Sequence, residues 1–152
     1  MDCEEFRKLL PLGVESKLGW WRRRRFFQHL EACPWCQLEW NCTEGSPIAR
    51  IADTIIEQAI RDAAREIHIE PSEGGVSVLN RHGDDLREMT PLPLYIEEPL
   101  SFRLKAMAGM DPRRRDTAQQ GCLSFQHGGT DYRFAVATTP VGDRERIVMR
   151  LL

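Results

Sequence analysis

The residues best suited to chemistry lie near the N-terminus, in the segment His29-x3-Cys33-x2-Cys36. Residues i and i+4 of a helix lie on one face, so His29 and Cys33 would extend from the same side. Cys36 follows at the next turn, where a Cys-x-x-Cys pair can hold one ion with two thiolates. Zinc favours imidazole and thiolate ligands, and a closed tetrahedral site needs a fourth one. The spacing therefore predicts a zinc site.

Two cysteines could supply the fourth ligand. Cys3 is preferred, because the short helix that it begins can fold back against the helix carrying His29, and Cys42 is the competitor that lies closer in sequence. A module of about 40 residues is too small to be stable on its own core, so metal binding would supply much of its folding free energy. We expect a structural site formed by Cys3, His29, Cys33 and Cys36. Buried, reduced cysteines beside an exposed histidine are the alternative.

Aromatic and basic residues fill the segment before His29. Trp20, Trp21, Phe26 and Phe27 are expected mostly in the core of this small module, with one or two exposed as an interaction patch. Arg22–Arg25 could bind phosphates, but four consecutive residues span a full helical turn and do not face one groove. We therefore favour a solvated helix face over a nucleic-acid site.

Composition and charge narrow the class of protein. A chain of 152 residues can hold a small module and one medium domain. Its 41% of hydrophobic and 29% of charged residues are typical of a folded globular protein. The net charge of −2 provides no general attraction to polyanions, so nucleic acid is not expected as a partner. No oligomeric state follows from the sequence.

The N-terminal sequence and the cysteines indicate the compartment. Met-Asp-Cys-Glu-Glu-Phe lacks the basic start and apolar run of a secretory signal. No stretch reaches the roughly 20 apolar residues that span a bilayer. Four of the five cysteines lie in the first 42 residues, and in a reducing compartment such clustering favours metal binding over disulfides. We expect a cytoplasmic protein without a transmembrane segment.

The elements that position these residues divide into two parts. Residues 1–42 predict a helical hairpin, with a short helix over Cys3–Leu10 closed by Pro11 and a second from about Ser16, as N-cap, to Cys33. Residues 43–48 contain Gly and Pro and form the expected linker. Residues 49–152 are the expected second domain.

Hydrophobic periodicity predicts an α+β fold for this second domain. An amphipathic helix spans about 48–65, and another begins at Leu100 and ends at Gly109, after an extended or turn-rich segment over Pro91–Pro99. Strands are expected at 67–69, stopping at Pro71, and at 76–81, 86–89, 122–125, 132–138 and 146–152. This order predicts a mainly antiparallel sheet with two helices.

Cys3 and the run His29-Leu30-Glu31-Ala32-Cys33-Pro34-Trp35-Cys36 also carry a family resemblance. Residues 1–42 resemble the zinc-finger module found at the N-terminus of many anti-sigma factors. The resemblance implies a helical hairpin that binds zinc and serves as a protein-docking element.

Four ordered segments carry a second resemblance: Ala64–Pro71, Arg81–Glu88, Arg103–Asp111 with Gln119 and Gly121 after it, and Arg133–Leu152. Through them residues 47–152 resemble the domain that precedes the motor domain in type II secretion ATPases and type IV pilus assembly ATPases. In that family, basic residues of this domain approach nucleotide. Here Ser77, Leu79 and Cys122 replace several of them.

No catalytic or nucleotide-binding residue is predicted. The phosphate-binding loop Gly-x4-Gly-Lys-Ser/Thr does not occur in the sequence. His68 alternates with two isoleucines on a strand, and we favour a hydrogen-bonded structural role for it. We expect a non-catalytic interaction or regulatory protein that docks on a motor ATPase or platform component of a secretion or pilus system. The alternative is an anti-sigma-like regulator whose zinc module binds a sigma factor.

Overall fold

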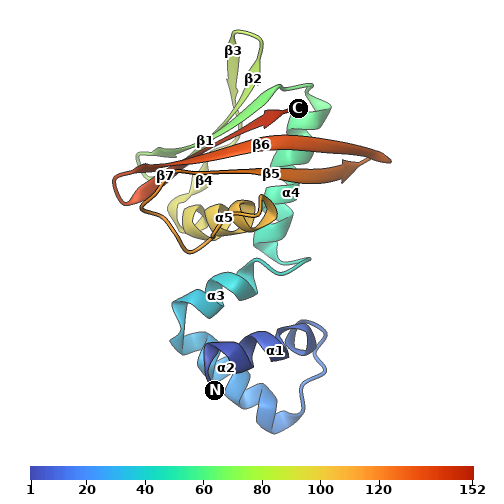
Figure 1. Cartoon of the computed structure of the whole chain (residues 1–152), viewed down its shortest axis with the longest axis vertical. Helices are drawn as coiled ribbons and strands as arrows, with labels where there is room; N and C mark the ends of the chain where they lie inside the picture. The colour runs from blue at the N-terminus through green and yellow to red at the C-terminus, as the bar shows by residue number, and fades with distance from the viewer.

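The computed structural model describes residues 1–152 and has a small helical module at one end and a sheet at the other (Figure 1). The helical module consists of α1 (Cys3–Val14), α2 (Trp20–Ala32) and α3 (Pro34–Asn41). Two longer helices, α4 (Pro47–Arg61) and α5 (Leu94–Met107), lie between this module and the sheet (Figure 1). None of these helices is long and apolar enough to cross a bilayer.

The first helix is longer than the sequence predicts. Asp2 caps it, since the Glu5 backbone N–H donates to Asp2 Oδ1 at 2.7 Å. The predicted end before Pro11 is wrong, because α1 runs through Pro11 to Val14. Pro11 removes one helical hydrogen bond, to the carbonyl of Arg7, and Arg7 lies on the exposed side of the helix. Glu15 N–H then donates to the Pro11 carbonyl and closes the last turn.

The second helix begins later than predicted, and a third helix follows it. Ser16 is not an N-cap: it has a φ of 57°, in the left-handed region, and α2 begins after Gly19. Helix α2 ends at Ala32 because Pro34 disfavours helical geometry at Cys33, which has φ −115° and ψ 106°. Pro34 is then the first residue of α3, where its missing N–H costs nothing.

The second domain has two helices, as predicted, but their boundaries differ from the predicted ones. Ser46 caps α4, with its Oγ accepting from Ala49 N–H at 3.1 Å, and the apolar face of α4 is buried. Helix α5 begins at Leu94 and contains Pro99, so the expectation of an extended segment up to Pro99 is wrong. Only Leu92–Pro93, labelled β4, pairs there, with β2 (Gly75–His82).

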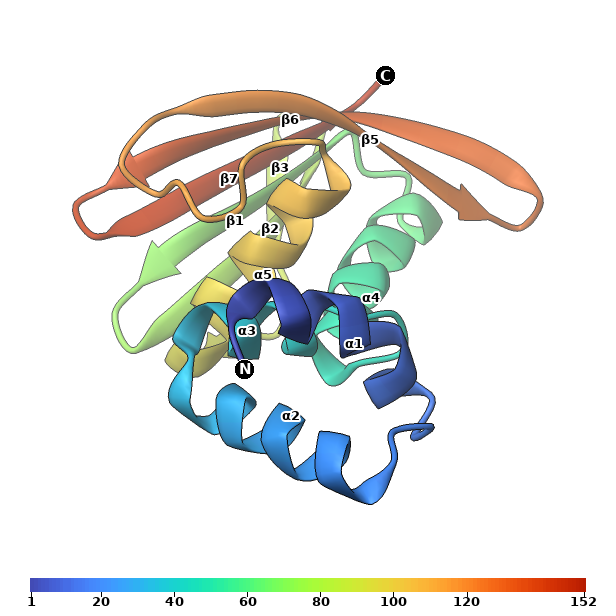
Figure 2. The same cartoon turned by 60° about the horizontal axis from the view of Figure 1, so that its bottom comes forward.

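The sheet is antiparallel at every pairing, as predicted. Its strand order is β3-β2-β1-β7-β6-β5, with β4 beside β2. Helices α4 and α5 lie on one face of the sheet (Figures 1 and 2). The remaining strand bounds are β1 (Glu66–Ser72), β3 (Asp85–Glu88), β5 (Gln119–His127), β6 (Thr130–Val141) and β7 (Arg144–Leu151).

Two hydrophobic cores of very different size hold the molecule together. The larger has 23 buried residues from the sheet, α4 and α5. The smaller, inside the helical module, has three: Phe6, Phe26 and Cys36. Leu38 and Cys42 follow α3's first turns and belong to the larger core. The end of the helical module is thus packed into the second domain.

Buried charges fix the segment that follows α5. Lys105 and Glu145 are almost fully buried and form an ion pair of 2.5 Å between Nζ and Oε2. Lys105 Nζ also donates to the Arg114 carbonyl at 2.6 Å, and Ser101 Oγ donates to Glu145 at 3.2 Å. The bond to Arg114 ties the segment after α5 to that helix, and the two bonds to Glu145 tie α5 to β7.

Candidate metal centre

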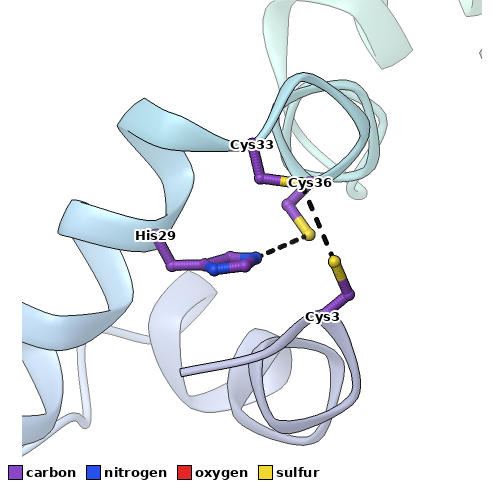
Figure 3. A group of neighbouring side chains, drawn as sticks. All are labelled: Cys3, His29, Cys33 and Cys36. Carbon is purple, nitrogen blue, oxygen red and sulfur yellow. Dashed lines mark hydrogen bonds between the residues drawn. The ribbon is translucent and has the colours of Figure 1, made fainter.

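Four side chains singled out from the sequence converge in the helical module (Figure 3). One ligand atom from each of Cys3, His29, Cys33 and Cys36 can be chosen so that all four lie within 4.8 Å of one another. The Cys3 and Cys33 sulfurs are 3.7 Å apart, and His29 Nε2 lies 3.2 Å from Cys36 Sγ. The four donors therefore surround one point.

Three helices bring the donors to this point. Cys3 is the first residue of α1, His29 lies in the last turn of α2, and Cys36 lies in the first turn of α3. Cys33 joins α2 to α3. Helix α1 is held against α2 by stacking of Phe6 on Phe26, whose ring centroids are 4.3 Å apart. This contact carries Cys3 to the partners that lie some 30 residues later in the chain.

The geometry fits a tetrahedral metal ion. Zinc–sulfur bonds of about 2.3 Å in a regular tetrahedron place two sulfurs about 3.8 Å apart, and a sulfur and a nitrogen about 3.5 Å apart. The observed 3.7 Å between Cys3 and Cys33 and 3.2 Å between His29 and Cys36 are close to these separations. Three thiols and one imidazole would fill the coordination sphere, which is typical of structural zinc sites.

The two cysteines of the Cys-x-x-Cys pair have opposite electrostatic environments. The backbone N–H of Cys36 lowers the pKa of Cys33, because it donates to the sulfur and stabilises the thiolate. Burial raises the pKa of Cys36, whose side chain is fully buried. Without a metal the Cys36 thiol therefore keeps its proton, and a bound cation would have to displace it.

The other two cysteines lie elsewhere. Cys42 is buried beneath α5, where its Sγ donates to the Pro99 carbonyl at 3.4 Å, and burial raises its pKa to about 12. Cys122 is exposed on β5. The structure thus brings Cys3 to the cluster and leaves its competitor, Cys42, outside it.

Sequence reasoning missed a polar link beside the cluster. Glu39 on α3 accepts from Arg7 Nε of α1 at 3.0 Å and pairs with Arg113 Nη2 of the segment after α5 at 2.5 Å. The Arg113 guanidinium also lies over the Trp35 ring, 5.6 Å from its centroid. Nothing local marks Glu39, because Arg113 is 74 positions away in sequence.

The remaining sequence candidates fall into surface and structural roles. Phe26 is buried, whereas Trp20 and Trp21 are 64% and 71% exposed, so both tryptophans lie outside the core. His68 lies on β1 with its Nε2 2.9 Å from Glu66 Oε2. Arg81 of β2 reaches the same carboxylate at 3.4 Å. His68 is therefore part of a polar network on the sheet face opposite α4 and α5.

Two family models match the chain. Residues 41–152 match the family described as Type II/IV secretion system protein. Residues 3–37 match the family described as Putative zinc-finger. The two matches together cover most of the helical module and the whole second domain.

Curated relatives and a solved structure match the same regions. "Type II secretion system protein HxcR" of Pseudomonas aeruginosa is 35% identical over 109 residues, which cover 72% of this chain and 23% of that protein. "Type II secretion system ATPase E" of Vibrio cholerae is 32% identical over 152 residues, which cover 99% of this chain and 29% of that protein. The chain thus spans less than a third of the length of either relative.

The X-ray structure of the Legionella pneumophila ATPase DotB superposes with a TM-score of 0.52 at 18% identity. The match covers 67% of this chain and 29% of DotB. At this identity the likeness concerns the fold alone.

Proposed function

The chain belongs to the type II/IV secretion system protein family and carries a zinc-finger module before the family domain, and from this premise we propose that residues 1–152 form a non-catalytic docking unit. The unit binds one zinc ion through Cys3, His29, Cys33 and Cys36. It docks on a motor ATPase or an assembly-platform component, on the cytoplasmic side of a secretion or pilus system.

The observation that carries the proposal is the convergence of four soft donors in a module with almost no core. Only Phe6, Phe26 and Cys36 are fully buried there, and the hydrophobic side chains packed around them are only partly buried. So small a core offsets little of the entropy of ordering some 40 residues, whereas a structural zinc ion contributes on the order of 10 kcal/mol. Zinc would therefore hold the helices in the arrangement that a partner recognises, and it would take no part in a reaction.

The non-catalytic role is supported by what residues 1–152 contain. A nucleotide-hydrolysing site of this family type would need backbone amides and a lysine of a phosphate-binding loop, and no Gly-x4-Gly-Lys-Ser/Thr sequence occurs here. On the free face of the sheet, Ser77 and Leu79 stand where the resemblance calls for arginines. Calorimetry with ATP and magnesium is expected to show no binding at micromolar concentrations, and such binding would refute this part of the proposal.

The metal is tested by elemental analysis of protein purified without added zinc. We expect about one zinc per chain, since the four donors fill one tetrahedral site. Cys36→Ser removes a buried donor and should lower this content strongly, whereas Cys122→Ser changes an exposed cysteine far from the cluster and serves as the control. A wild-type zinc content below about a tenth of an ion per chain would overturn the assignment.

The partner is tested by co-purification from the native cell. We expect to recover a motor ATPase or a platform protein with the wild type. The zinc-free Cys36→Ser variant should not recover it. Recovery of a sigma factor would instead favour the anti-sigma-like alternative. The match of residues 3–37 to the zinc-finger family supports that alternative. That alternative leaves the family domain over residues 41–152 without a role, and we therefore rank it second.

A further inference from the structure

The first turns of α2 form an exposed surface of aromatic and basic side chains, which we call the tip surface and define as Trp20, Trp21 and Arg22–Arg25. The two indole rings contact each other edge to face, with centroids 4.3 Å apart, and are 64% and 71% exposed. Side chains of this size and apolarity are usually buried, so two adjacent exposed tryptophans indicate a contact surface.

The arginines of the tip surface are largely free of partners within the molecule. Arg25 lies 3.8 Å from Glu5, while Arg22, Arg23 and Arg24 are exposed and form no ion pair. Arg23 instead lies over the Phe27 ring, 5.8 Å from its centroid. Helix α2 has no acidic residue in its first turn. A cluster of uncompensated positive charge thus lies on a chain whose net charge is −2, and it complements an anionic partner.

The position of the tip surface suits a flat partner. Helix α2 lies at the end of the molecule farthest from the sheet, so a plane can approach it without meeting the second domain (Figures 1 and 2). Leu12 and Val14, at the end of α1 just before this helix, are also exposed, at 36% and 43%. The helical module therefore exposes further apolar side chains in the turn of α1 that precedes α2 in the chain.

We infer that the tip surface binds the anionic phospholipid headgroups of a bilayer, with the tryptophans at the level of the headgroups. Indole rings favour the membrane–water interface, and arginines near an anionic surface add attraction. Successive helical residues are about 100° apart, so the four arginines spread around α2. Such a spread matches mobile headgroups surrounding a tip better than the single line of phosphates along a nucleic-acid groove.

The zinc-loaded full chain is tested by co-sedimentation with vesicles. We expect binding to phosphatidylcholine vesicles that contain about 30% phosphatidylglycerol, little binding to pure phosphatidylcholine, and weakening in about 0.5 M salt. Trp20→Ala/Trp21→Ala and Arg22→Gln/Arg24→Gln should each lower the partition coefficient about tenfold or more. These substitutions lie at the opposite end of α2 from His29, so zinc content and circular dichroism should match the wild type.

Matched controls come from exposed residues of the second domain. Tyr95 is 77% exposed, and Arg50 and Arg61 are both exposed on α4. Neither Tyr95→Ala nor the double variant Arg50→Gln/Arg61→Gln should lose vesicle binding. Absence of wild-type binding to the anionic vesicles would overturn the inference. It would also be overturned if the tip variants bound as well as the wild type. Binding of duplex DNA that needs the arginines but not the tryptophans, without vesicle binding, would assign the surface to nucleic acid instead.

Discussion

At the scale of single residues, Cys36 differs from the other three donors of the cluster in its burial. Its side chain is fully buried, whereas Cys3, His29 and Cys33 are partly exposed. Because burial raises the pKa of Cys36, its thiol keeps its proton in the metal-free protein, and a metal held by the four residues would displace that proton.

Replacing Cys3 and replacing Cys42 should affect zinc retention differently. Cys3→Ser should lower zinc affinity and loosen the helical module, because a lost thiolate removes binding energy that is also folding energy. Cys42→Ser should leave zinc bound, because Cys42 contacts the Pro99 carbonyl and not the cluster. The rate of zinc transfer to a chelator measures both. Faster transfer from Cys42→Ser than from Cys3→Ser would contradict the assignment of Cys3.

Glu66 makes the stability of the second domain depend on pH. The hydrogen bond from His68 lowers the pKa of Glu66, with a smaller contribution from Arg81. A lowered folded pKa means that the stabilisation is present above the unfolded pKa of about 4.3 and is lost as the pH falls through the folded pKa. Glu66→Gln should therefore cost on the order of 1 kcal/mol at pH 7 and much less near pH 3.

Urea unfolding of the wild type and Glu66→Gln at both pH values measures this difference. Any pH effect on the Cys/His cluster is common to both proteins and cancels in the comparison. Glu73→Gln, in the exposed turn after β1, is the control and should show no such difference. An equal loss of stability at both pH values would show that the carboxylate charge is unimportant.

The sequence predicts three of the four cluster residues more directly than the fourth, Cys3. His29, Cys33 and Cys36 lie within eight positions, so they stay close in any compact fold of this segment. The structure nevertheless places them on two helices, because α2 ends at Ala32 and Cys36 lies in α3. Cys3 depends on α1 folding back onto α2, which in turn depends on the stacking of Phe6 on Phe26. The sequence favoured Cys3 over Cys42 but offered no distance to decide between them.

At the scale of elements, Gly121 permits the close packing of α5 against β5. A Cβ at this position would lie 2.2 Å from the backbone carbonyl oxygen of Ala108, which caps the C-terminus of α5. Backbone atoms at this distance have to move, so Gly121→Ala should destabilise the protein by about 1–3 kcal/mol.

Chemical denaturation, followed by loss of the sheet signal, measures the effect of Gly121→Ala. Gly19→Ala is the control for an added Cβ that meets no atom within 4 Å. Because Gly19 is the N-cap of α2 and alanine is a poorer cap than glycine, this variant should lose at most about 1 kcal/mol, and only in the helical module. If Gly121→Ala were as stable as the wild type, the contact between α5 and β5 would relax without cost.

Elements with strong periodicity are the ones that the sequence predicts well. The amphipathic helix α4 and the alternating strands are found close to their expected places, since burial of one face selects their period. The errors concern the helix end at Pro11, the cap at Ser16, α3, the strand end at Pro71 and the start of α5, all at or near prolines or glycines. Pro71 does not stop β1, which runs to Ser72 with Pro71 paired to Val76. Proline is compatible with a helix start or an exposed turn as well as with a helix end, and tertiary packing decides among these.

At the scale of the whole molecule, the two parts are joined by more than the linker. Leu38 and Cys42 enter the larger core, and Arg103 Nη1 donates to the Cys42 carbonyl at 2.8 Å. Glu39 joins Arg7 and Arg113 across the junction. These contacts link residues far apart in sequence, so no local pattern could have predicted them. We propose that two modules meet near residue 42 through these contacts.

Removal of zinc should therefore change hydrogen exchange beyond the helical module. Chelation is expected to speed hydrogen exchange in α1, α2 and the start of α3, because three buried residues do not hold them without metal. Exchange in residues 111–118 should also rise, since Arg113 would lose the fixed positions of Glu39 and Trp35. The central strands β1 and β7 should stay protected, because the larger core does not include the cluster.

Arg113→Gln in the zinc-loaded protein is the matched control, which should raise exchange in residues 111–118 and leave α1 and α2 unchanged. If chelation left residues 111–118 as protected as before, the junction would not transmit the state of the metal site. If it unfolded β1 and β7 as well, the two parts would form a single cooperative unit, and the proposed modular division would be wrong.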